Sequence, residues 1–214
     1  MCWNQEVSLN TFLFSTFVLG LIIYNNTYTQ YKIQEINNIW VYLFFFAFIL
    51  MQLFEFFIWR NIDNKYYNSF FSKGATLLIT SQPIFSLMIL SNIPLRNILL
   101  GVYLLLAIPF IIYKFFTKDI HSEVSKSGHL RWIFFETTPI HWIIYLFFLL
   151  FTFFYNKTIL GLFFAFITLS FSFYNYLQDR TIGSMWCWII NIVMVYYAIY
   201  LLIYLPFCER KRFC

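Results

Sequence analysis

Long apolar runs alternate with short polar segments along most of the chain. A membrane-spanning helix needs about 20 mostly apolar residues, and seven runs reach or approach that length. These runs are residues 8–25, 39–59, 74–91, 97–116, 139–155, 158–177 and 183–206. The pattern predicts an all-α polytopic transmembrane helix bundle of seven helices. Residues 1–214 are expected to form a single transmembrane domain that ends in a short basic tail, 207–214.

The fifth run is the shortest, and the longest connection precedes it. If residues 139–155 lay at the membrane interface instead of crossing it, the number of spans would fall to six. The connection, residues 117–138, contains the apolar patch Trp132–Phe135, which is too short to span a membrane. We expect this patch to lie on the membrane surface.

The composition agrees with a membrane protein and excludes a soluble domain. Hydrophobic residues make up 61% of the chain and charged residues 11%, whereas soluble domains carry about 25% charged residues. No Lys or Arg precedes the first apolar run, so this run is predicted to be a retained helix and not a secretory signal peptide. The lipid bilayer is the expected partner. The net charge of +5 is expected to meet lipid headgroups, not nucleic acid.

Basic residues are distributed unevenly between the two sides of the predicted bundle. We call the membrane side of the N-terminus side A and the opposite side side B. Side B has three basic loop residues, Lys32, Arg96 and Lys157, and the basic tail. Side A has Arg60, Lys65, Lys73, Lys114, Lys118, Lys126, Arg131 and Arg180. The positive-inside rule predicts a cytoplasmic N-terminus from the loops, although the tail opposes this orientation.

Polar side chains inside the predicted spans are concentrated near side A. Such side chains are costly in hydrocarbon and usually face the interior of a bundle. The predicted cavity or ligand-binding residues are Gln52, Glu55, Gln82, Asn175, Asp179, Cys187, Trp188 and Asn191. Pro83 follows Gln82 and can kink its helix. The distribution predicts a polar cavity that opens to side A, although the same residues could serve only as hydrogen bonds between helices.

Several kinds of chemistry can be compared with the residue types present. All eight lysines are predicted in loops, helix ends or the tail, so no membrane-embedded lysine is available to bind retinal. His121, His129 and His141 match no metal-binding spacing that we recognise, and no metal or cofactor is expected. A zinc site that combines loop histidines with Asp119 or Glu136 stays open. No G-x-S-x-G nucleophile motif is present.

The four cysteines, Cys2, Cys187, Cys208 and Cys214, show no CxxC spacing and no disulfide framework. Removal of Met1 would place a free α-amine beside the Cys2 thiol, where it could act as the base for a nucleophile. Acylation at the membrane edge and simple burial are the alternatives. Cys2 and His141 are therefore the candidate catalytic residues. Cys208 and Cys214 flank the basic tail, a context that suits palmitoylation.

Several short motifs resemble a family of uncharacterised multi-pass membrane proteins of bacteria, protists and large DNA viruses, whose members begin Met-Cys-Trp. The chain begins Met1-Cys2-Trp3 but departs from the family's usual Ser-Ala at the next two positions. Further similar segments are Gln82–Phe85, the Gly/Trp/Pro-containing stretch 128–142, and Gly183 with Trp186-Cys187-Trp188. The resemblance implies a seven-helix fold and carries no established activity, so no catalytic residue is transferred from it.

Three functions agree with these observations. The first is small-ligand or solute binding, transport or channel activity through a polar cavity that opens to side A. Because the chain is short for a carrier, a homo-oligomer is one way to build one. The second is a structural or interaction role in the membrane. The third is a membrane-embedded enzyme that acts on a lipid-like substrate with Cys2, His141, Glu55 or Asp179.

Overall fold

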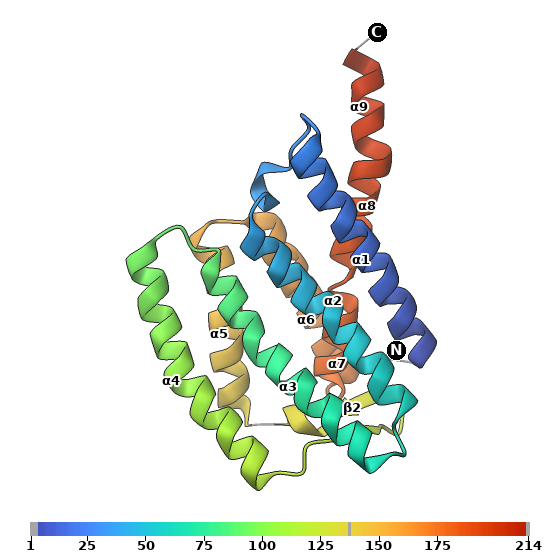
Figure 1. The fold of residues 1–214 in the computed structure, drawn as a ribbon, viewed down its shortest axis with the longest axis vertical. Coiled ribbons are helices and arrows are strands. Elements are labelled where there is room, and N and C mark those ends of the chain that lie inside the picture. Colours follow the sequence, from blue (N-terminus) through green and yellow to red (C-terminus); the bar gives the residue numbers. More distant parts are fainter. Residues whose placement is uncertain (1–3, 137, 213–214) are drawn as a thin grey trace.

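The computed structural model describes residues 4–136 and 138–212, and it shows a bundle of α-helices with one small β-hairpin (Figure 1). The helices are α1 (Gln5–Tyr28), α2 (Ile39–Arg60), α3 (Lys65–Met88), α4 (Ile93–Thr117), α5 (Pro139–Tyr155), α6 (Ile159–Tyr176), α7 (Ile182–Ile189), α8 (Ile192–Ile199) and α9 (Leu205–Arg212). The prediction of an all-α bundle is confirmed.

Asparagine side chains set the first residue of several helices. Asn4, Asn38, Asn64 and Asn92 each accept a hydrogen bond from a backbone N–H in the first turn of α1, α2, α3 and α4. Capping by Asn64 explains why α3 begins at Lys65 and not at residue 74, where the apolar run starts. The predicted fifth run, 139–155, coincides with α5.

The predicted seventh helix, 183–206, is not one continuous α-helix. It divides at Ile190–Asn191 into α7 and α8, and a π-helical segment, Tyr200–Tyr204, connects α8 to α9. At the break, the N–H of Asn191 donates to the carbonyl of Trp188 in a tighter turn. The predicted basic tail begins inside α9, which projects beyond the rest of the bundle (Figure 1).

Five helical segments of the described chain are long and apolar enough to cross a membrane. They are α1, α2, α4, α6 and the run Ile182–Cys208 that contains α7 and α8. α5 is apolar but shorter, and α3 carries more polar residues. The chain is therefore an integral membrane protein, and its exposed apolar surface is the surface that lipid would contact.

Successive long helices run in alternating directions (Figure 1). The start of α1 and the α2–α3, α4–α5 and α6–α7 connections lie at one end, side A, and the other connections lie at side B. α2 packs between α1 and α3, and α3 also packs against α4 and α5. The largest buried cluster lies between α2, α3, α5 and α7, and includes Met51, Ile79, Leu149 and Trp186.

The long connection between α4 and α5 folds over the side A end of the bundle. It forms a hairpin of β1 (Ser122–Val124) and β2 (Leu130–Trp132), followed by a 3-10 turn, Ile133–Phe135. Trp132 and Phe134 are 3% and 2% exposed and belong to the main buried cluster. The prediction that this patch lies on the membrane surface is wrong, because its rings pack against the helix ends instead.

Two buried polar side chains attach this connection to the helices. The Asn68 amide on α3 donates to the carbonyls of Ile62 and Ser122, and its oxygen accepts from the Ser122 N–H. Lys114 Nζ, in the last turn of α4, donates to the carbonyls of Phe134 and Glu136. Lys114 is 6% exposed, so this helix-end lysine is an internal anchor and not a solvated loop charge.

Replacement of Asn68 by alanine should destabilise the protein by about 2–3 kcal/mol, because the backbone N–H and carbonyl of Ser122 would lose their partner in a buried site. Thermal unfolding in detergent measures the loss, and proteolysis within residues 118–138 should accelerate. Asn175→Ala is the matched control, since Asn175 is exposed and its amide bonds only within its own helix. Equal stability of the two variants would contradict the anchoring role.

Candidate functional site

Five of the predicted cavity residues lie inside the bundle. Gln52, Glu55 and Gln82 are 0% exposed, Cys187 is 4% exposed and Asn191 is 7% exposed. Gln52 and Glu55 share one face of α2, and Glu55 lies close enough to Cys187 on α7 for an electrostatic interaction. The Tyr145 hydroxyl donates to Gln82 Oε1 at 2.5 Å and joins α5 to α3. We call Gln52, Glu55, Gln82, Tyr145 and Cys187 the interior polar residues.

The hydrogen-bonding capacity of these residues is only partly satisfied within the described chain. Gln52 Nε2 and Oε1 and Gln82 Nε2 have no hydrogen-bond partner among the described residues. An unsatisfied buried polar group costs about 1–3 kcal/mol. The Gln52 amide is therefore a costly feature to hold inside a membrane protein, and such groups are often retained for function.

The other predicted residues lie elsewhere. Asn175 is exposed and Asp179 half-buried. Trp188 Nε1 donates to Thr11 Oγ1 at 3.0 Å, a contact that attaches α7 to α1. His141 is exposed, with its Nδ1 2.6 Å from Thr138 Oγ1. Cys2 lies outside the described residues.

The interior polar residues are covered at side A by the α4–α5 connection. Ile120, Leu130, Trp132 and Phe134 of this connection belong to the same buried cluster as Cys187. The carboxylate of Glu136 bonds Arg131, and His121 lies 3.5 Å from Asp119. Within residues 4–136 and 138–212, no group of three or more His, Cys, Asp or Glu is arranged to hold a metal ion.

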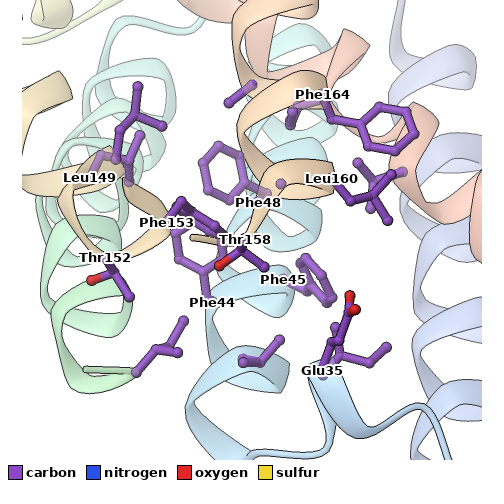
Figure 2. A pocket seen from close by; sticks show the side chains of 18 of the residues that line it. Glu35, Phe44, Phe45, Phe48, Leu149, Thr152, Phe153, Thr158, Leu160 and Phe164 are labelled. Atoms are coloured by element: carbon purple, nitrogen blue, oxygen red, sulfur yellow. The ribbon is translucent and has the colours of Figure 1, made fainter. Parts of the chain in front are cut away.

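A cavity of about 140 Å³ lies between α2, α5, α6 and the α7–α8 break (Figure 2). We call it the apolar pocket. Its walls are mainly aromatic and aliphatic side chains, and Figure 2 shows Phe44, Phe48 and Phe153 grouped at its centre. Polar residues lie at the side B connections, where Glu35, Asn156 and Thr158 contribute to the lining. An apolar volume with a few polar groups at one end is the usual form of a small-molecule site.

Two local features shape this pocket. Gly161 on α6 lies against Phe153, and a Cβ at Gly161 would be 2.7 Å from the Phe153 ring. A larger residue at this position would therefore force the Phe153 ring to move. Asn191, at the break, is the predicted cavity residue that lines the pocket, and its Nδ2 donates to the Cys187 carbonyl at 2.8 Å. The break thus connects the apolar pocket to the interior polar residues.

Sequence reasoning missed most residues of the apolar pocket. In a chain with 25% aromatic residues, a pocket-lining phenylalanine has the same sequence signature as a lipid-facing one. Two features of the sequence could have indicated the pocket. They are Gly161, a glycine within an apolar run, and Glu35, an acidic residue just before the second run.

Comparison of the chain with protein-family models, with curated proteins and with solved structures finds no match. The geometry of the bundle is therefore the basis for a functional interpretation.

Gln52→Met should stabilise the protein by about 1 kcal/mol, because it removes an unsatisfied buried amide while keeping the length of the side chain. Gln82→Met is the matched comparison and should destabilise the protein, because the buried Tyr145 hydroxyl loses its acceptor. Reversible unfolding in mixed micelles measures both changes. A loss of stability in Gln52→Met would show that a bound water or ligand forms hydrogen bonds with the Gln52 amide in the wild-type protein.

Proposed function

We propose that this membrane protein binds a small amphipathic ligand in the apolar pocket. The observation that carries the proposal is the pocket itself, an aromatic-lined cavity of about 140 Å³ between α2, α5, α6 and the α7–α8 break. A cavity of similar size lined by Leu, Ile and Phe in an engineered protein stays dry and binds benzene, so an apolar group is the occupant that the lining favours. The pocket supports the small-ligand hypothesis, with an apolar instead of a polar binding surface.

The polar end of the pocket favours a particular headgroup. The Glu35 carboxylate points from the 3-10 turn Gln34–Ile36 towards the pocket (Figure 2). Thr158 contributes a hydroxyl at the same end. A ligand with an apolar body and an amine or other hydrogen-bond donor would place the body among the phenylalanines and the donor near Glu35. A short alkylamine is the simplest molecule of this kind.

We further propose that the chain crosses the membrane seven times, with α1 to α6 as six spans and the run Ile182–Cys208 as the seventh. The alternation of the helices supports this topology (Figure 1). A cytoplasmic side A, as the basic loops predict, would place the Glu35 end of the pocket at the opposite face.

Transport is a second candidate, favoured by the broken last span. Discontinuous helices commonly form the binding sites of transporters, because the break leaves backbone groups free and allows the two halves to move. Here the break at Ile190–Asn191 contacts the apolar pocket, and Asn191 bonds Cys187 beside Glu55. Movement of the break on ligand binding would change the surroundings of both sites.

An enzyme or a purely structural protein has less specific support. His141, one proposed catalytic residue, is exposed and contacts Thr138 and Phe110, neither of them an interior polar residue. The apolar outer surface agrees with either role and does not favour one.

Ala165→Phe should weaken ligand binding at least about tenfold, because the added ring would occupy part of the pocket that Ala165 lines. A short alkylamine carrying a photoactivatable diazirine provides the measurement, with crosslinked peptides identified by mass spectrometry. We expect labelling of α5 and α6 around the pocket in the wild-type protein and its loss in the variant. Glu35→Gln should reduce labelling by the amine and not by an uncharged alcohol of the same length.

Ala107→Phe is the control, since Ala107 is also buried but packs in a separate cluster with Tyr103 and Phe148. Thermal unfolding confirms that each variant is folded before labelling is compared. Equal labelling of the pocket peptides in wild type and Ala165→Phe would contradict the proposal.

A further inference from the structure

The loop between α1 and α2 carries Glu35, the acidic residue at the side B end of the apolar pocket. Asn26, in the last turn of α1, is 2% exposed and bonds this loop with both ends of its amide. Its Oδ1 accepts from the backbone N–H of Ile33 at 2.8 Å, and its Nδ2 donates to the Tyr42 hydroxyl at 2.9 Å. The amide therefore joins α1, the loop and the start of α2.

The Tyr42 hydroxyl extends this connection to the other end of the loop. It donates to Asn37 Oδ1 at 3.1 Å. Ile33 and Asn37 flank the 3-10 turn Gln34–Ile36, so the turn is attached on both sides. We call the hydrogen bonds of Asn26 and Tyr42 to Ile33, to Asn37 and to each other the Asn26 clamp.

Packing holds the same turn from inside the bundle. Ile36 is 6% exposed and lies in a buried cluster with Val18 and Tyr197. Burial of Ile36 leaves the adjacent Glu35 at the side B end of the pocket, where Tyr197 is close enough for an electrostatic interaction. Among the residues that the structure describes, no Lys, Arg or His forms an ion pair with Glu35. Its carboxylate is therefore available to a cationic group of a ligand.

We infer that Asn26 determines the preference of the apolar pocket for cationic ligands, because the Asn26 clamp fixes the Glu35 carboxylate at the pocket. This role rests on the proposed ligand site and gives that site its charge selectivity. A carboxylate on a preorganised loop binds an ammonium group without the entropy cost of ordering the loop, and a charge-assisted hydrogen bond is stronger than a neutral one. Neither Asn26 nor Tyr42 lines the pocket, so Asn26 is a positioning residue that acts through Glu35.

Photolabelling of the intact protein in detergent tests this role with two diazirine probes, the short alkylamine and the alcohol of the same length. The quantity measured is the ratio of the two probe concentrations that give half-maximal labelling of the pocket peptides. In Asn26→Ala, the concentration required for the amine should rise about tenfold, as loss of one charge-assisted hydrogen bond predicts. The alcohol should bind as in the wild type, because the apolar lining is unchanged.

Two further variants separate positioning from a general loss of stability. Asn26→Ala combined with Glu35→Gln should show the same selectivity as Glu35→Gln alone, because the clamp acts only through this carboxylate. Tyr42→Phe keeps the bond between Asn26 and Ile33 and removes the bond to Asn37, so it should lose part of the selectivity. Tyr42→Phe also decides the result if thermal unfolding shows that Asn26→Ala does not fold.

Asn61→Ala is the matched control. Asn61 is half-buried at the side A end of α2, far along the chain from the loop, and its amide donates to the Phe57 carbonyl of that helix. This variant should keep the selectivity of the wild type.

Wild-type selectivity in Asn26→Ala and Tyr42→Phe, together with a loss of selectivity in Glu35→Gln, would overturn the role of Asn26 and leave the proposed ligand site standing. An equal loss of both probes in a folded Asn26→Ala variant would overturn this role as well. Absence of pocket labelling by either probe in the wild type would instead overturn the proposed function, and the role of Asn26 with it.

Discussion

Closure of the side A end of the bundle by the α4–α5 connection is the constraint on which the rest of the structure depends. Asn68 and Lys114 satisfy backbone groups of this connection inside the protein, where water cannot replace them. Because the connection is held, Trp132 and Phe134 cover the helix ends. The same residues shield the interior polar residues.

The last span shows how irregular backbone is accommodated in a membrane protein. Non-helical backbone is tolerated at membrane depth only where protein or a cavity surrounds it. The break at Ile190–Asn191 meets this condition, because Asn191 is 7% exposed and lines the apolar pocket. Its amide bonds the Cys187 carbonyl at the end of α7. The break is therefore part of the pocket and is stabilised by local hydrogen bonding.

The sequence predicts the helices well, but it does not predict how the α4–α5 connection folds over the side A end of the bundle. The difference has a physical reason. Continuous apolar runs are required to cross lipid, so α5 coincides with its predicted run and α2 nearly so. The Asn68–Ser122 hydrogen bonds join residues 54 positions apart, and no local pattern indicates such a pairing. Burial of Gln52, Glu55, Gln82 and Cys187 follows the predicted polar faces. The placement of Asn175 and Asp179 does not, because Asn175 lies on the exposed face of the last turn of α6 and Asp179 lies beyond the end of this helix.

The hydrogen bond from Trp188 to Thr11 joins positions 177 residues apart and so affects assembly during synthesis. At about 5–20 residues per second, α1 would remain in the membrane for roughly 10–35 s before its partner on α7 is made. During that interval α1 can pack against α2 but lacks its contact with α8. The first and last helices thus complete the bundle together, and a chain that terminates before α7 would leave the first helix incompletely packed.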